Sequence, residues 1–219
     1  MTQVKAVRRA LRDARCLTWR QPMTHDAVRV IRDEHAGLSA MLKSLSHMVR
    51  VGPDAPEIGG RDRYFDVLRA MLFYIDAFPE KNHHPKESNL LFPRLARAAP
   101  DLMPTIEQLE RDHMSGEMRV RELMHLLMAW EYLGELHRPA FENEAVRYVV
   151  FYLDHMKLEE TVLLPVAEKA LTEADWAVLD EAFCGHADPL STRRLRDPAY
   201  DRLFTRIVMH TPAPLGLGE

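Results

Sequence analysis

Two stretches of this 219-residue chain carry the same arrangement of metal-ligating residue types, His-x3-Glu-x3-Leu-x-Pro. The first stretch begins with His83 and contains Glu87, and the second begins with His155 and contains Glu159. Residues four apart lie on one face of an α-helix, about one turn from each other, so an imidazole and a carboxylate at this spacing can bind the same metal ion. The pattern therefore predicts two helices that each supply one nitrogen and one oxygen ligand to a metal centre.

An acidic residue followed by a histidine precedes each motif, as Glu34-His35 in the first half and Asp112-His113 in the second. The separation between this histidine and the histidine of the motif is 48 residues in the first half and 42 in the second. These similar separations fit one helical hairpin that is present twice. Because a duplicated pattern in register is hard to attribute to chance, we expect its four histidines and two glutamates to be metal ligands. Six histidines lack repeat partners and are expected to be structural or solvated: His25, His47, His125, His137, His186 and His210.

The ligand set of this repeat indicates the kind of metal. Imidazole nitrogens and carboxylate oxygens without thiolate suit iron or manganese, and sites of this kind in bundle cores are typically dinuclear. Each glutamate can bridge two ions through its two oxygens, with the histidines as terminal ligands. The only two cysteines, Cys16 and Cys184, lie far apart in the sequence, which excludes a disulfide scaffold and a cysteine-ligated zinc site.

Two further residues are candidate ligands, and the sequence leaves their assignment open. His84 precedes a proline, and the residue before a proline is disfavoured in helical geometry, so His84 in place of His83, or both, could face the metal. Glu117 lies four residues after His113 and is a candidate oxygen ligand. Glu160, by contrast, is expected to face solvent.

The elements that must position these residues are long helices, because apolar residues recur at three- and four-residue steps. We expect them at about residues 24–51, 62–98, 104–136 and 139–171. Prolines at Pro79 and Pro85 should disturb the second helix, and the glycines and prolines of residues 52–60 mark a loop. Long helices with short links are typical of an antiparallel up-down four-helix bundle. We therefore predict an all-α fold with the bundle at residues 24–171.

Residues outside the bundle form two appendages. Residues 1–23 are a basic N-terminal extension to which we attach no function. Residues 172–219 should form a short fifth helix and an irregular tail, with Thr172 and Asp175 as the helix cap and Gly185 as its end. Four apolar residues could anchor the tail: Leu203, Phe204, Ile207 and Val208.

The composition excludes several classes of protein. There are 29 Lys and Arg residues against 33 Asp and Glu, a formal net charge of −4 at pH 7, which argues against a nucleic-acid-binding protein. No apolar run approaches the roughly 18 residues that span a bilayer. The scarcity of cysteine fits a reducing cytoplasm. Nucleophile motifs, Gly-rich phosphate loops and dinucleotide fingerprints are absent from the sequence.

The six residues of the repeat, in their order along the chain, resemble the ligand pattern of the hemerythrin HHE cation-binding family over about residues 25–170. The resemblance implies a four-helix bundle around a non-haem di-iron centre, with two iron ions as the cofactor. It also implies that Glu87 and Glu159 bridge the two irons. The terminal ligands that it implies are His35, His83, His113 and His155.

One position departs from the family pattern. Oxygen-carrying hemerythrins use five histidines, one pair being His-x3-His in the third helix, whereas His113 is followed at four residues by Glu117. His84 is the candidate for the missing nitrogen. An extra oxygen donor together with an open coordination position would favour reactivity over reversible storage of O2.

Two classes of function are consistent with the resemblance. The first is a protein that binds O2, nitric oxide or iron as a carrier, sensor or buffer. The alternative is a di-iron enzyme that decomposes hydrogen peroxide or reduces O2, since a metal ion polarises an oxygen ligand and the surrounding pocket decides whether that ligand is released or reacts. The sequence shows no second catalytic domain, which favours binding, and no receptor or DNA-binding module that would indicate a sensor. Whether the chain is an enzyme and whether it forms a homodimer are left open.

Overall fold

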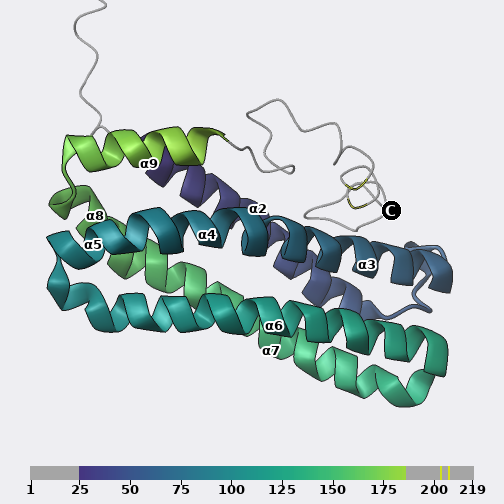
Figure 1. The fold of residues 1–219 in the computed structure, drawn as a ribbon. Coiled ribbons are helices and arrows are strands. Elements are labelled where there is room, and N and C mark those ends of the chain that lie inside the picture. The colour runs from purple at the N-terminus through teal and green to yellow at the C-terminus, as the bar shows by residue number, and fades with distance from the viewer. Residues whose placement is uncertain (1–24, 186–202, 204–206, 208–219) are drawn as a thin grey trace, which may run out of the picture.

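The computed structural model describes residues 25–185 together with Leu203 and Ile207. Within these residues every regular element is helical, which confirms the predicted all-α fold. Four long helical stretches run antiparallel to one another and form a bundle, with a shorter helix beside one end (Figure 1). The predicted basic extension and two of the predicted tail anchors, Phe204 and Val208, lie outside the described residues.

The first and third bundle helices are uninterrupted. They are α2 (Asp26–Val51) and α6 (Met103–Leu133), close to the predicted ranges. Each is followed by a glycine, Gly52 or Gly134, with a φ of +76° or +96°. Positive φ values are strained for residues with a side chain, so glycine allows the chain to leave each helix sharply.

The second and fourth bundle helices both contain π-helical segments. The second comprises α3 (Arg61–Ala77), the π-helical η3 (Pro79–His83), α4 (His84–Lys86), the π-helical η4 (Glu87–Leu91) and α5 (Phe92–Ala98). The fourth comprises α7 (Arg138–Leu158), the π-helical η7 (Glu159–Leu163) and α8 (Leu164–Ala170). Short 3₁₀ turns lie in the connections: η2 (Pro56–Ile58), η5 (Pro100–Leu102) and η6 (Glu135–His137).

The π-helical segments η4 and η7 begin at the two glutamates of the sequence repeat. A proline follows each glutamate after six residues, Pro93 and Pro165, and proline cannot donate the backbone hydrogen bond that continues an α-helix. Single π-helical turns inside α-helices occur frequently at functional sites. The disturbance predicted at Pro79 coincides with the start of η3. The disturbance predicted at Pro85 is displaced, because Pro85 lies within α4 and the next π-helical segment, η4, begins at Glu87. The π-helical segment η7 of the fourth helix was not predicted.

The fifth helix is α9 (Glu173–Gly185), which ends at the predicted glycine. The backbone N–H of Asp175 donates to Oγ of Thr172 at 3.2 Å, and the backbone N–H of Thr172 donates back to Oδ2 of Asp175 at 3.2 Å, which confirms the predicted cap. This helix packs on the start of α2, where Oδ1 of Asp180 accepts a hydrogen bond from the backbone N–H of Ala27 at 2.7 Å.

The apolar core consists of two clusters, one toward each end of the bundle. One cluster includes Leu45, Leu68 and Trp130, and the buried Ile207 and half-buried Leu203 pack with it, so these two predicted anchors do contact the core. The other cluster joins the start of α2 to α5, α8 and α9. Between the two clusters each bundle helix carries buried polar side chains. None of the described helices combines the length and the apolar composition of a membrane span.

Candidate metal centre

Side chains from all four bundle helices meet between the two apolar clusters. Seven buried residues form two groups, and in each group the candidate ligand atoms lie within 4.8 Å of one another. The first group is His35, His83, Glu87 and Glu159. The second group is His84, His113 and His155. The structure thus brings together all six residues of the sequence repeat and adds His84.

Each glutamate directs one carboxylate oxygen to each group. Oε1 of Glu87 lies 3.2 Å from Nε2 of His83, and its Oε2 lies 3.5 Å from Nε2 of His113. Oε2 of Glu159 lies 3.2 Å from Nε2 of His35, and its Oε1 lies 3.4 Å from a histidine Nε2 of the second group. A carboxylate placed between two sets of nitrogens in this way has the orientation of a bridging ligand.

The donor atoms at the centre fit metal cations. Six of them are buried and have no hydrogen-bond partner within the protein: both carboxylate oxygens of Glu87 and of Glu159, and Nε2 of His113 and of His155. An unpaired buried polar group costs about 1–3 kcal/mol, so such groups are rare unless another ligand satisfies them. Five imidazoles and two carboxylates without thiolate form a set that suits first-row transition metals such as iron.

The charges of the two glutamates are offset by the histidines around them. Burial lowers the pKa of His35, but the nearby carboxylates of Glu159 and Glu160 outweigh this and raise the pKa to about 9. Burial raises the pKa of Glu159, but the neighbouring histidines bring it well below its usual range. Protons therefore supply positive charge at this centre, and a cation that took their place would release them.

A second polar side chain lies beside Nδ1 of each of the five histidines, within hydrogen-bond distance for four of them and at a longer ion-pair distance for His155. The Nδ1 partners are Glu160 for His35 at 3.0 Å, Glu34 for His83 at 2.6 Å, Glu80 for His84 at 3.0 Å, Ser88 for His113 at 3.0 Å, and Asp112 for His155 at 3.5 Å. Contacts of this kind fix the ring orientation and the tautomer of a ligand histidine, which leaves Nε2 for the metal.

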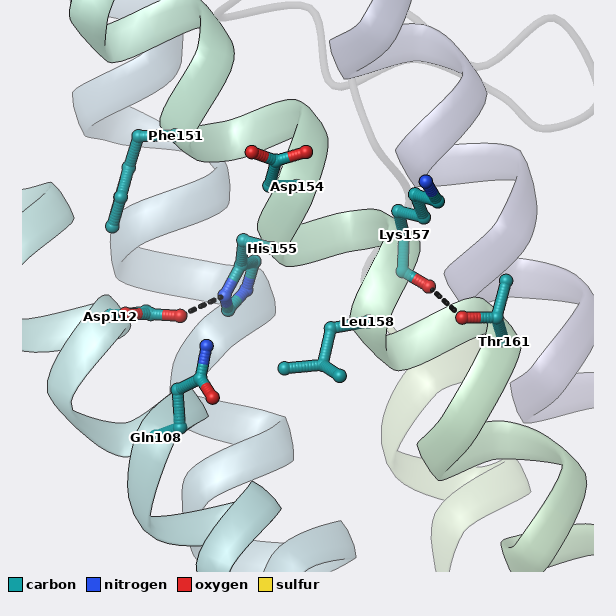
Figure 2. Close-up of a pocket in the computed structure, with 8 residues that line it drawn as sticks. All are labelled: Gln108, Asp112, Phe151, Asp154, His155, Lys157, Leu158 and Thr161. Carbon is teal, nitrogen blue, oxygen red and sulfur yellow. Dashed lines mark hydrogen bonds and ion pairs between the residues drawn. The ribbon is translucent and has the colours of Figure 1, made fainter.

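The acidic residues that precede the first histidine of each half have a defined place in this arrangement. Glu34 is hydrogen-bonded to the motif histidine of its own half, His83, and Asp112 lies 3.5 Å from Nδ1 of His155 in the second half. Figure 2 shows the second contact, in which Asp112 on α6 faces the imidazole of His155 on α7. The sequence repeat therefore includes these acids and not only the ligands.

The residues that follow the bridging glutamates hold the remaining histidines across the bundle. Glu160 follows Glu159 and contacts His35 of the first half, and Ser88 follows Glu87 and contacts the equivalent histidine of the second half. The prediction that Glu160 faces solvent is only half right. Its side chain is 40% exposed, but its Oε1 is bound to Nδ1 of the histidine.

His84 has no counterpart in the second half, where Met156 stands at the equivalent position. Although it precedes a proline, His84 is helical, with φ −55° and ψ −39°, and both it and His83 lie at the centre. Burial raises the pKa of its partner Glu80 to about 7, and burial together with the neighbouring histidines lowers the pKa of His84 well below its usual value. The hydroxyl of Tyr152 donates to the other oxygen of Glu80.

Gly116 on α6 makes room for this contact. A Cβ at this position would clash with the hydroxyl of Tyr152 and lie 3.0 Å from Oε1 of Glu80. Sequence reasoning did not single out Gly116, Glu80 or Ser88, because nothing in a single sequence shows which helix surfaces face one another.

Glu117 is not brought to the centre. Its side chain is 45% exposed and forms an ion pair with Arg121 on the surface of α6. Glu117 lies about one turn after His113, but α6 is rotated so that this position faces the surface and not the centre. The structure thus contradicts the interpretation of Glu117 as an oxygen ligand.

The other histidines of the described residues are absent from both groups. His25 stacks on Trp176, with ring centroids 4.2 Å apart, and His47 contacts Arg50. His125 is exposed and His137 is half-buried. His186 and His210 lie outside the part of the chain that the structure describes.

Two open grooves of about 380 Å³ each reach the outer side of the centre. One is lined by Asp112, Phe151 and His155 (Figure 2). The other is lined by His35 and Glu160 among other residues. One buried histidine of each group therefore lies behind the floor of a groove on the outer side of the centre.

A comparison with protein families agrees with this geometry. The family model of the hemerythrin HHE cation binding domain matches residues 21–167, about two thirds of the 219-residue chain. The matched range contains all seven residues of the two groups and ends before α9. No curated protein matches the chain.

Proposed function

This chain belongs to the hemerythrin HHE cation-binding family, and on that premise we propose that it holds two non-haem iron ions and binds O2 or nitric oxide. In this role it would act as a carrier or sensor of the small molecule, or as an iron buffer. The ions would be held by the seven residues of the two groups, with Glu87 and Glu159 as bridges. Iron in such a site supplies a redox-active centre with coordination positions open to small ligands.

The observation that supports two ions is the division of each carboxylate between the groups. Oε1 of Glu87 faces a histidine of the first group and Oε2 faces one of the second, and Glu159 is divided in the same way. One ion could use only one side of each carboxylate, which would leave the other oxygen buried without a partner. Two ions satisfy all four oxygens.

The two positions are unequal, which supports the binding of an external ligand. The first offers two histidines and one oxygen from each glutamate, whereas the second offers three histidines and the other two oxygens. The first position therefore has one protein donor fewer and more room for an added ligand. We place the binding of the small molecule there.

Aromatic side chains limit what can enter. The ring of Phe92 stacks on His113 with centroids 5.5 Å apart, and the ring of Phe183 meets His83 edge-on at 6.2 Å. Apolar clusters lie on both sides of the centre. A small uncharged molecule such as O2 or nitric oxide crosses such surroundings at little cost, whereas a charged substrate does not.

The alternative function is a di-iron enzyme that decomposes hydrogen peroxide or reduces O2. The argument for the enzyme was that Glu117 would be an extra oxygen donor to the metal. In the structure this side chain lies on the surface of α6 instead. The fifth nitrogen comes instead from His84, which gives the second position three histidines. This ligand set supports binding over turnover, and we propose binding as the function.

Optical spectroscopy of the iron-loaded protein tests the proposal. Reduced protein exposed to O2 should change its spectrum and return to the starting spectrum when O2 is removed, with no turnover. A His113→Ala variant should lose this response. Sustained evolution of O2 from hydrogen peroxide that depends on Glu87 would instead establish the enzyme, and a protein that retains no iron would refute both.

A further inference from the structure

The outer contacts of two equivalent histidines differ in chemical type. Nδ1 of His35 meets the carboxylate of Glu160, whereas Nδ1 of His113 meets the hydroxyl of Ser88 at the equivalent position of the repeat. The same hydroxyl donates a hydrogen bond to Oε2 of Glu110 at 3.0 Å. Glu110 lies on α6, one turn before His113, so the helix that carries the histidine also carries the far end of this chain of contacts.

The direction of the serine proton decides which nitrogen of the imidazole carries a proton. A hydroxyl has a single proton to donate, and in the structure it is given to Glu110. The oxygen of Ser88 can then only accept from the ring, which favours the form of His113 with its proton on Nδ1 and with Nε2 free for a metal. With no acceptor behind it, the hydroxyl could donate to Nδ1 and stabilise the form with its proton on Nε2, which cannot bind a metal.

We propose that Glu110 is a positioning residue for the second metal position, acting through Ser88 to hold His113 in its metal-binding tautomer. This inference deepens the proposed function and rests on it. Glu110 itself touches no ligand atom of either group. It is the outer member of a relay that ends on one imidazole.

The first half of the repeat supports this assignment, because it has a different residue at the position of Glu110 and a carboxylate at the position of Ser88. The residue equivalent to Glu110 is Arg32, and it lines the same groove as Glu160. Around His35, the outer carboxylate belongs to Glu160, directly after the bridging glutamate, and the helix of His35 carries the cation Arg32. Around His113, the hydroxyl of Ser88 takes the place of Glu160, and the carboxylate is that of Glu110, on the helix of His113. Each half thereby puts one carboxylate behind its histidine.

Metal titration of purified protein tests the proposal. Glu110→Ala should weaken iron binding at one of the two positions by about 10- to 100-fold, the usual effect of removing an outer contact of a ligand histidine. Glu107→Ala is the matched control, because this exposed glutamate lies on the same helix and should leave the affinity unchanged. The double variant Ser88→Glu with Glu110→Ala should recover affinity, because it reproduces the arrangement of Glu160.

A second readout needs no metal. Nitrogen NMR of the metal-free protein should find a larger share of the form of His113 with its proton on Nδ1 in the unaltered protein than in Glu110→Ala. The same share in both proteins, equal iron affinity, or a double variant no better than Glu110→Ala would overturn the assignment. An unaltered protein that binds no iron would refute the proposed function, whereas two bound irons with no effect of Glu110→Ala would refute only the relay.

Discussion

Nε2 of His35 and Nε2 of His83 lie 3.3 Å apart, although the two residues are 48 positions apart in the sequence and belong to different bundle helices. Two imidazole nitrogens at this distance are held together by one shared proton or by one shared cation. Their outer nitrogens are fixed by Glu160 and Glu34, so neither ring is free to turn away. These outer contacts direct both Nε2 atoms toward the same point in the first group.

Removal of a bridging carboxylate should empty at least one metal position. Glu159→Ala deletes an oxygen ligand from each group, so the iron content should fall from about two ions per chain to one or none. Elemental analysis of the purified variant measures this. Glu168→Ala, an exposed glutamate on α8, is the control, and retention of both irons by Glu159→Ala would refute the bridging role.

The choice between His84 and Glu117 as ligand can be tested by a pair of variants. His84→Ala should weaken the second position, because it removes one of three nitrogens there. Glu117→Ala should leave the iron content unchanged, since this side chain pairs with Arg121 on the surface. Parallel iron titrations compare the two. Loss of iron from Glu117→Ala but not from His84→Ala would reverse the assignment.

Gly116→Ala should destabilise the bundle. The added Cβ would collide with the hydroxyl of Tyr152, and overpacking of this kind costs about 1–3 kcal/mol in the free energy of unfolding. Chemical denaturation measures the loss, with Gly185→Ala as the control because a Cβ there meets no other atom within 4 Å. Adding Tyr152→Phe, which removes the hydroxyl, should recover part of the stability, and a Gly116→Ala variant as stable as the original protein would contradict this packing.

The metal-free protein should lose stability as the pH rises from about 6.5 to about 9. The folded-state pKa of His35 is raised to about 9 from 6.5 because the nearby carboxylates of Glu159 and Glu160 outweigh burial. A raised pKa stabilises the fold below the unfolded-state value and this contribution is lost as pH passes the folded-state value, here on the order of 3 kcal/mol.

Denaturation of the metal-free protein at pH 6 and pH 9.5 checks this prediction. His35→Gln should flatten the dependence, whereas His125→Gln, at an exposed position, should not. Stability that rises over this interval in the unaltered protein would show that the proton on His35 does not support the fold.

The repeat residues that meet at the centre could be singled out from the sequence because their pattern is local. His83 and Glu87 are four residues apart, and helical geometry alone places them on one face. The same rule failed for Glu117, since spacing from His113 does not show how far α6 is turned toward the centre. His84 could be recognised only as an alternative, because its neighbouring proline argued against the helical conformation that the structure shows.

The outer contacts could not be predicted, because they join helices whose relative rotation and register the sequence does not specify. Glu160 was expected in solvent, yet it contacts His35 across 125 positions of the chain. The contact between Ser88 and Glu110 likewise depends on how η4 packs against α6. Four helices and their approximate ends could be predicted from apolar periodicity, whereas the π-helical turns at Glu87 and Glu159 could not.

Anomalous diffraction at the iron edge from crystals of the iron-loaded protein tests the central claim most directly, because it locates each ion and the atoms that hold it. Two peaks are predicted at the middle of the bundle, each contacting one oxygen of Glu87 and one of Glu159, with two histidines at the first peak and three at the second. A single peak, or peaks that do not share both glutamates, would contradict the account.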